Sequence, residues 1–83
     1  MEALKYPLST EKAIRMIESD NILTFIVDLK ASRSKIKEEI EKRFNVKVED
    51  IRILITSKGK KKAYVRLNNN YPAIDIVTKL GLM

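Results

Sequence analysis

The sequence predicts an α+β fold in which strands and helices follow one another in the order β-α-β-α-β-β-α, within a single domain spanning residues 1–83. Segments rich in β-branched residues alternate with segments whose apolar residues recur every three or four positions. The last two strand-like segments are joined only by a short turn, as in a hairpin. Two strand and helix pairs followed by a hairpin indicate a sheet of about four strands covered by helices. The 83 residues suffice for one hydrophobic core and not for two.

The N-terminal quarter contains one strand and one helix. Residues 3–6 form a short edge strand that stops at Pro7, because proline has no N–H to donate to a sheet. Ser9 and Thr10 offer a helix N-cap, and the helix ends near Ser19, before a pair of turn-forming residues. The apolar side chains of this helix share one stripe, which consists of Ala13, Ile14, Met16 and Ile17.

The middle of the chain contains two strands on either side of the longest helix. Residues 22–28 are apolar on both faces and predict a central strand. Ser32 or Ser34 caps the helix and Asn45 ends it. The apolar residues on its buried face are spaced by four and are Ile36, Ile40 and Phe44. Residues 51–56 form a third strand that is again apolar on both faces, so we expect two central strands with helices on both faces of part of the sheet.

The last segments predict a fourth strand and a third helix. The strand covers residues 63–67 and gives way to three consecutive asparagines. A helix begins at Tyr71 and Pro72, and Gly81 terminates it. The side chains expected on its inward face are Ala73, Ile76 or Val77, and Leu80.

Composition excludes several classes of function. The chain has no cysteine and no histidine, so we expect no disulfide, no metal and no cofactor. Without these side chains, and without a P-loop or a nucleophile-elbow serine, we do not expect an enzyme. The apolar runs are far shorter than the roughly 20 residues that span a bilayer, and no leader opens the chain. We therefore expect a cytoplasmic protein without membrane insertion and without a stable homo-oligomer.

A basic hairpin, residues 57–66, is the main functional signal. Its bases are Lys58, Lys60, Lys61, Lys62 and Arg66, and it contains no acid, which gives +5 of the chain's net charge of +6. The remaining 12 bases and 11 acids leave only +1. Lysines crowded around a turn repel one another, so a polyanion is the expected partner. The alternative is that these lysines only protect a sheet edge or aid solubility.

A second basic region surrounds the start of the longest helix. Lys30, Arg33, Lys35 and Lys37 lie where the helix macrodipole is positive and disfavours cations. Backbone N–H groups and lysines together suit a phosphate, although a solvated helix start is the alternative. Tyr64, in the basic strand, either stacks on a nucleobase or packs against a helix.

Four stretches of the chain carry a resemblance to a known family. They appear in the family's order and are Tyr6–Ala13, Ile36–Val48, Gly59–Leu67 and Ala73–Gly81. Taken together they resemble the universal large-subunit ribosomal protein L23 family, with coverage from Leu4 to Leu82. The resemblance implies a largely antiparallel sheet and a structural role in the large ribosomal subunit. In this family the protein binds mainly the third domain of the large rRNA, beside the exit of the nascent-peptide tunnel.

The resemblance also implies which residues face RNA and which face protein partners. Glu11, in the family's Ser/Thr-Glu-Lys motif, lies where relatives dock factors that meet the emerging chain. Such factors are the signal recognition particle, the translocon and, in bacteria, trigger factor; neighbouring large-subunit ribosomal proteins are further expected partners. The RNA-facing positions carried over from the family are Lys5, Lys12, Arg33, Lys35, Lys58, Lys60, Lys61, Lys62, Tyr64 and Arg66.

The chain departs from two branches of this family. Bacterial relatives extend a long loop into the tunnel wall where this chain has a short turn at residues 57–61, and eukaryotic relatives carry a long basic N-terminal extension that is not seen here. The chain therefore resembles the archaeal branch. Two other functions are compatible with the residues alone: a protein-interaction module that uses the acidic middle of the longest helix, and an RNA or DNA chaperone that does not reside on the ribosome.

Overall fold

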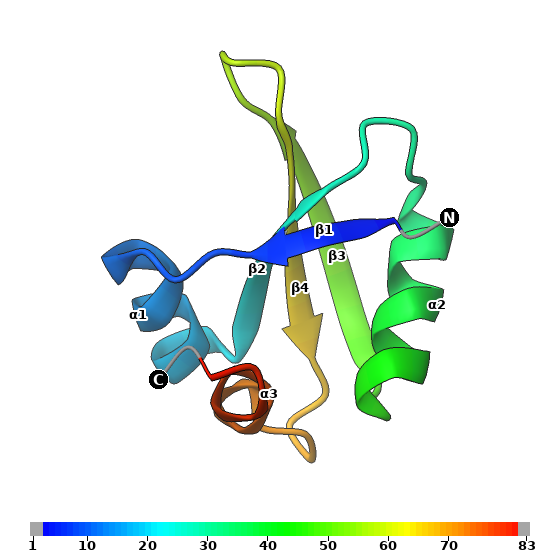
Figure 1. Cartoon of the computed structure of the whole chain (residues 1–83). Helices are drawn as coiled ribbons and strands as arrows, with labels where there is room; N and C mark the ends of the chain where they lie inside the picture. The colour runs from blue at the N-terminus through cyan, green and yellow to red at the C-terminus, as the bar shows by residue number, and fades with distance from the viewer. Residues whose placement is uncertain (1–2, 82–83) are drawn as a thin grey trace.

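Strands and helices alternate along the chain in the predicted order (Figure 1). The computed structural model describes residues 3–81. The elements are β1 (Leu4–Pro7), α1 (Glu11–Asp20), β2 (Ile22–Val27), α2 (Arg33–Phe44), β3 (Val48–Ile55), β4 (Lys61–Leu67) and α3 (Ala73–Lys79). The α+β class and the order β-α-β-α-β-β-α are therefore confirmed.

The four strands form one antiparallel sheet in the order β1-β2-β4-β3. β1 lies at one edge, as the proline at its end predicts, and β2 is central. β3 lies at the other edge, so the prediction that residues 51–56 form a central strand is wrong. Leu54 and Ile55 of β3 remain 50% and 63% exposed. An apolar run alone does not distinguish a strand buried between neighbours from an edge strand that keeps apolar residues in solvent.

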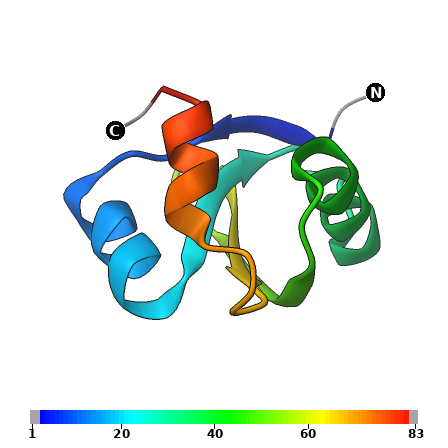
Figure 2. The same cartoon turned by 90° about the horizontal axis from the view of Figure 1, so that it is seen from below.

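One face of the sheet carries the hydrophobic core. Alternate side chains of a strand point to opposite faces, and the strand residues of the core cluster are Leu4, Leu23, Phe25, Val27, Val48, Ile51, Ala63, Val65 and Leu67. Helices α2 and α3 cover this face with the side chains of Ile36, Ile40, Ala73, Ile76 and Val77. Ile17 of α1 joins the same cluster. Figure 2 shows α3 lying between α1 and α2, which closes the core.

The other face of the sheet is covered only beside β2. There α1 contributes Ala13 and Met16, which line a small cavity together with Thr24 of β2 and Tyr64 of β4. Towards β3 the side chains on this face are in solvent, as Leu54 shows. The expectation of helices on both faces therefore holds for the β2 side, while the part formed by β4 and β3 stays open.

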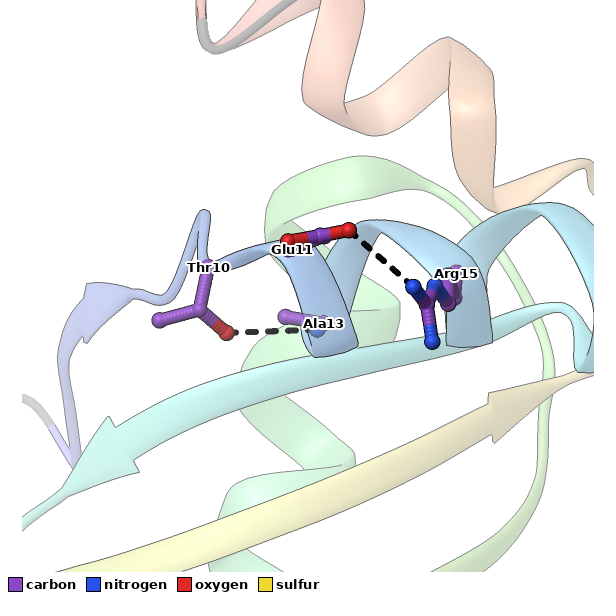
Figure 3. A network of polar contacts seen from close by, with 4 residues as sticks. All are labelled: Thr10, Glu11, Ala13 and Arg15. Carbon is purple, nitrogen blue, oxygen red and sulfur yellow. Dashed lines mark hydrogen bonds and ion pairs between the residues drawn. The ribbon is translucent and has the colours of Figure 1, made fainter.

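The helix ends follow the capping rules. Thr10 caps α1, with its Oγ1 accepting a hydrogen bond of 3.2 Å from the N–H of the third helical residue (Figure 3). Ser32, and not Ser34, caps α2, and its Oγ accepts from the N–H of Lys35 at 3.2 Å. Asn45 ends α2 in the left-handed conformation with φ of 55°, as predicted.

Helix α3 is shorter than the sequence predicts. It ends at Lys79, and Leu80, which was expected on the inward face, is 39% exposed at the cap position. Gly81 follows with φ of 73°, which confirms that it terminates the helix. Leu82, the last residue of the family resemblance, lies outside the described residues.

Asn21 joins the end of α1 to the start of α3. It caps α1 in the left-handed conformation with φ of 57°. Its Nδ2 lies 3.3 Å from the carbonyl oxygens of Leu67 and Asn68 and 3.2 Å from that of Tyr71. Its Oδ1 accepts a 2.6 Å hydrogen bond from the N–H of Ala73. The residue at the cap position of α3 makes no side-chain hydrogen bond of its own, so Asn21 caps α3 from a distant part of the chain.

Glu39 holds β1 against α2. Its Oε1 accepts a hydrogen bond from the N–H of Ala3 at 2.7 Å, and its Oε2 accepts one from the N–H of Leu4 at 3.1 Å. Burial raises the pKa of the Glu39 carboxyl, but these two hydrogen bonds and the nearby charges of Arg43 and Lys35 outweigh it. The net effect lowers the pKa below its ordinary value.

We expect Glu39→Gln to lower the free energy of unfolding by about 1 kcal/mol at pH 7, because an amide accepts hydrogen bonds through only one oxygen. The folded-state pKa of Glu39 lies below the unfolded one. Its stabilising contribution is therefore present above the unfolded pKa and is lost as the pH falls through the folded pKa. Urea unfolding at pH 7 and at a series of acidic pH values measures both effects.

Glu18→Gln, on the exposed surface of α1, is the matched control for this prediction and should leave stability unchanged. The Glu39 variant should also lose part of the pH dependence on the acid side. If the free energy of unfolding fell with acidic pH at the same slope in both variants, the assigned role of Glu39 would be contradicted.

Candidate nucleic-acid interface

The basic side chains of β4 that face away from the core are set by the alternation of the strand. They are Lys62, Tyr64 and Arg66. Lys62 and Tyr64 are half-buried, and Arg66 is exposed. Because β4 is an inner strand, these side chains lie within the sheet surface and not at its rim. We call this side of β4 and β3, opposite to α2 and α3, the open face.

Strand β3 adds a second row to the open face. The cross-strand neighbours of Lys62, Tyr64 and Arg66 on β3 are, in that order, Leu54, Arg52 and Asp50. The Nε of Arg52 lies 3.9 Å from the Oδ2 of Asp50, and both side chains are largely exposed, so this ion pair is weak. Arg52 is absent from the predicted RNA-facing residues. The sequence signal that could have identified Arg52 is its position between Ile51 and Ile53. Because these two side chains pack against the core, the side chain between them points to the opposite face.

Helix α1 brings Lys12 next to the open face. A groove of about 470 Å³, which we call the open-face groove, is lined by α1 and by residues of β2, β3 and β4. Its cations are Lys12, Arg52 and Arg66, and its carboxylates belong to Asp20 and Asp50. The less polar part of its lining consists of Met16, Ile22 and Tyr64. Three of the predicted positions, Lys12, Tyr64 and Arg66, thus meet in one groove although they are far apart in the sequence.

The tip of the basic hairpin projects beyond the rest of the domain (Figure 1). The N–H of Thr56 donates to the carbonyl of Lys60 at 2.8 Å, and Gly59 takes a φ of 78°, which closes a tight turn. The Nζ of Lys60 donates to the hydroxyl of Tyr6 at 3.2 Å and lies 5.9 Å from the centre of its ring. Lys58 is exposed. The tip therefore presents two cations, one of them positioned by β1.

Lys61 does not share the face of Lys62. Its cross-strand partners place it on the core side of β4, at the end of the strand. Its Nζ donates to the carbonyl of Ala31 at 2.6 Å and lies 3.4 Å from the carbonyl oxygen of Leu29. Lys61 thus ties the loop between β2 and α2 to β4, and the structure does not bring it together with the other predicted lysines.

The other predicted cations lie apart from the open-face groove. Lys5 is exposed on β1. Arg33, the first residue of α2, lines a second pocket of about 210 Å³ together with Lys37 and the start of β3. Lys35 is exposed, and its backbone N–H is already bound by the Ser32 cap. The basic residues at the start of α2 are therefore close together in the structure, but they do not belong to the open face.

Glu11 is exposed at the first position of α1. Its Oε1 accepts a hydrogen bond of 3.0 Å from the Nη2 of Arg15 on the next turn (Figure 3). A pair of this kind between exposed side chains is weak, so both remain available for contacts outside the chain. The position near the helix N-terminus also favours the negative charge.

Apart from Arg52, which forms the weak pair with Asp50, the cations of the open face and of the hairpin tip form no internal ion pair. Within residues 3–81, no carboxylate forms an ion pair with Lys12, Lys58, Lys60, Lys62 or Arg66. In the same part of the chain, no group of three acidic residues is placed to hold a metal ion. Nor is any helix there long and apolar enough to cross a membrane. A surface of unpaired cations attracts polyanions.

The fold and this surface define a class of protein. A four-stranded sheet with its core face covered by helices, and with lysine, arginine and tyrosine on the open part of its other face, is similar to the arrangement of small RNA-binding domains. The chain belongs to the ribosomal protein L23 family, because the family model described as Ribosomal protein L23 matches residues 2–73. The match spans the four strands and the first two helices and ends at the first residue of α3, so it stops short of the resemblance seen in the sequence.

Membership in this family fixes the general role of the chain. It is a protein of the large ribosomal subunit that takes part in translation and associates with rRNA and with other ribosomal proteins. The family is structural and is not a family of enzymes. It also implies association with ribosomes in the cytoplasm.

Proposed function

We propose that the protein, as one rRNA-binding domain, contacts the large rRNA through its open face and the tip of the basic hairpin, beside the exit of the nascent-peptide tunnel. The main support is that Lys12, on or beside the open face, lines one groove with Arg66 and a neighbouring cavity with Lys62. None of them forms an ion pair within the described residues. Phosphate groups of folded RNA supply the charge that these side chains lack.

The cations have different roles in this proposal. Lys58 and Lys60 reach phosphates beyond the body of the domain, and Arg66 binds phosphate or a base edge through its forked guanidinium. Lysine pairs with phosphate as a point charge and reads little sequence, so specificity comes mainly from RNA shape. Three outlying cations meet neighbouring RNA segments, and these are Lys5, Arg33 and Lys35.

Lys61→Ala is expected to weaken the fold more than RNA binding. Two carbonyl oxygens lose their donor, which should lower the free energy of unfolding by about 1 kcal/mol. Lys62→Ala should change stability by less than about 0.5 kcal/mol and lower the affinity for rRNA roughly 3- to 10-fold. Urea unfolding and filter binding on both variants make the comparison. A larger loss of affinity for the Lys61 variant would contradict this division of roles.

We also propose that the exposed end of α1 around Glu11 docks factors that meet the emerging chain, such as the signal recognition particle and the translocon. Glu11→Lys should weaken recruitment of the signal recognition particle to ribosomes on the order of tenfold, because a charge-assisted contact becomes a repulsion. Co-sedimentation of the purified particle with variant ribosomes measures this. Glu18→Lys makes the same charge change elsewhere on α1, and equal losses for both variants would refute a specific dock at Glu11.

A protein-interaction module built on the acidic middle of α2 is the weaker alternative, because two of its three carboxylates already bind backbone N–H groups within the domain. Glu39 holds β1, and the Oε2 of Glu41 accepts a 3.0 Å hydrogen bond from the N–H of Val48. Glu38 forms only an exposed pair with Lys42 at 3.0 Å, so it alone of the three stays available to a partner.

We further assign the chain to the archaeal-type branch of the family. The support is the tight turn between β3 and β4, in which Thr56 and Lys60 are hydrogen-bonded to each other. This turn leaves no long loop to line the tunnel wall.

Sucrose-gradient sedimentation tests ribosomal residence directly. The tagged full-length protein, expressed in cells, should travel with large subunits and move to the top of the gradient after ribonuclease digestion. A free RNA chaperone would stay near the top without digestion. A protein-interaction module would keep its partners after ribonuclease treatment, and either result would overturn the proposed function.

A further inference from the structure

We propose that the open-face groove binds the guanine base of an unpaired rRNA nucleotide, an inference that rests on the proposed RNA-binding function. The groove is formed by a helix on one side and the sheet on the other, and its volume of about 470 Å³ is in the range of small-molecule sites. A continuous RNA double helix presents its phosphates and hides its bases, so it has no free base to insert into the groove. An unstacked nucleotide has such a base.

The apolar part of the groove suits the faces of a base. Tyr64 is half-buried, and Met16 and Ile22 line the same groove. A base that leaves its stack loses contact on both faces, and proteins replace this contact with aromatic and apolar side chains. Tyr64 is the aromatic residue of the groove lining, so it is the stacking partner in this arrangement.

The carboxylates of the groove indicate which base it accepts. Asp20 and Asp50 line a groove that also contains Lys12, Arg52 and Arg66, and they would repel a phosphate. Guanine presents two adjacent N–H donors, at N1 and N2, which match a carboxylate. It also presents two adjacent acceptors, O6 and N7, which match an arginine. No other base offers both pairs of groups.

The lysines beside the groove account for the phosphates of the same nucleotide. Lys12 lines the groove and also a neighbouring cavity of about 30 Å³, where it is joined by Lys62. Tyr64 and Met16 belong to both linings. A base stacked on Tyr64 therefore lies next to two lysines that remain available for its flanking phosphates.

Four single-stranded hexanucleotides test this inference on the full-length protein. One is hexauridine, and in the other three the third base is guanine, adenine or cytosine. We expect the guanine hexamer to bind about tenfold more tightly than the others and to shift the NMR signals of the Met16 methyl and the Ile22 methyls. The chain has three methionines, so methyl-labelled Met16 is readily assigned through Met16→Leu.

Three sets of variants separate base recognition from general attraction. Asp20→Asn with Asp50→Asn should abolish the preference for guanine while binding hexauridine as well as or better than the wild type, because repulsion is removed. Tyr64→Leu should weaken binding of all four hexamers roughly tenfold, whereas Tyr64→Phe keeps the ring and should bind normally. Lys58→Ala with Lys60→Ala, at the hairpin tip, should weaken all hexamers equally and preserve the preference.

The outcomes distinguish this inference from the proposed function. Equal binding of all four hexamers, a preference for another base, no hexamer binding, or unmoved Met16 and Ile22 signals would each overturn the guanine site. If a large rRNA fragment still bound with a steep salt dependence, the proposed function would stand without it. If that fragment also failed to bind, the proposed function would fall as well.

Discussion

Replacing Lys58, Lys60 and Lys62 together with alanine is expected to lower the affinity for a cognate large-subunit rRNA fragment about 10- to 100-fold at roughly 0.1 M salt. These three side chains form no ion pair within the described residues, so their loss removes contacts with RNA and none with internal carboxylates. With fewer phosphate contacts, binding also releases fewer counterions from the RNA. The slope of log affinity against log salt should therefore become less steep by about 2, as measured by filter binding over a salt series.

The matched control replaces Lys42, Lys47 and Lys79, which are exposed and belong neither to the open face nor to the hairpin tip. This control makes the same change in net charge. It should lower affinity only slightly, because distant charges are screened beyond about one Debye length. Equal losses in the two triple variants would mean that net charge alone attracts RNA. A wild-type affinity that stays flat with salt would rule out phosphate binding altogether.

Asn21→Ala is expected to cause the largest loss of stability, about 3 kcal/mol, with a fall in Tm of roughly 10 to 20 °C. The substitution removes the group that caps α3 and that contacts three carbonyl oxygens. It also forces alanine into the left-handed conformation at φ of 57°. Asn21→Gly relieves only the backbone strain, so it should recover about 1 kcal/mol of the loss.

Asn45 is the matched control, because it ends α2 in the same left-handed conformation with φ of 55°. It is exposed, and within the described residues its side chain makes no hydrogen bond. Asn45→Ala should therefore cost only the backbone term, about 1 kcal/mol, and Asn45→Gly should be close to neutral. Thermal and urea unfolding of the four variants separate the two contributions. Similar losses at both asparagines would show that the side-chain contacts of Asn21 contribute little.

Much of the fold could be predicted because short-range physics determines it. The cap at Thr10, the left-handed stop at Asn45 and the tight turn at Gly59 each depend on the conformation of a few adjacent residues. The alternation along residues 61–67 likewise assigns side chains to two faces of a strand. These local rules placed the elements in their observed order.

The candidate site was only partly predictable, because its residues come from separate elements. Lys12 and Arg66 reach one groove only when α1 packs beside β2 and β2 pairs with β4. Arg52 escaped the prediction because the apolar residues around it suggested a strand buried on both faces. Lys61 and Lys62 are adjacent residues of the same type. Lys61 nevertheless binds backbone carbonyls of a loop, whereas Lys62 lies on the open face.

The order of residues along the chain is enough to predict a small, basic α+β domain with its surplus charge in residues 57–66. Periodicity and capping are properties of neighbouring residues, so they can be read along the chain. The packing of the elements was needed to show that β4 is an inner strand, that β3 is an edge strand and that part of one sheet face stays open. The reason is that the sequence of a strand indicates which side chains share a face, but not which of the two faces the helices cover. That choice depends on how distant apolar surfaces pack together.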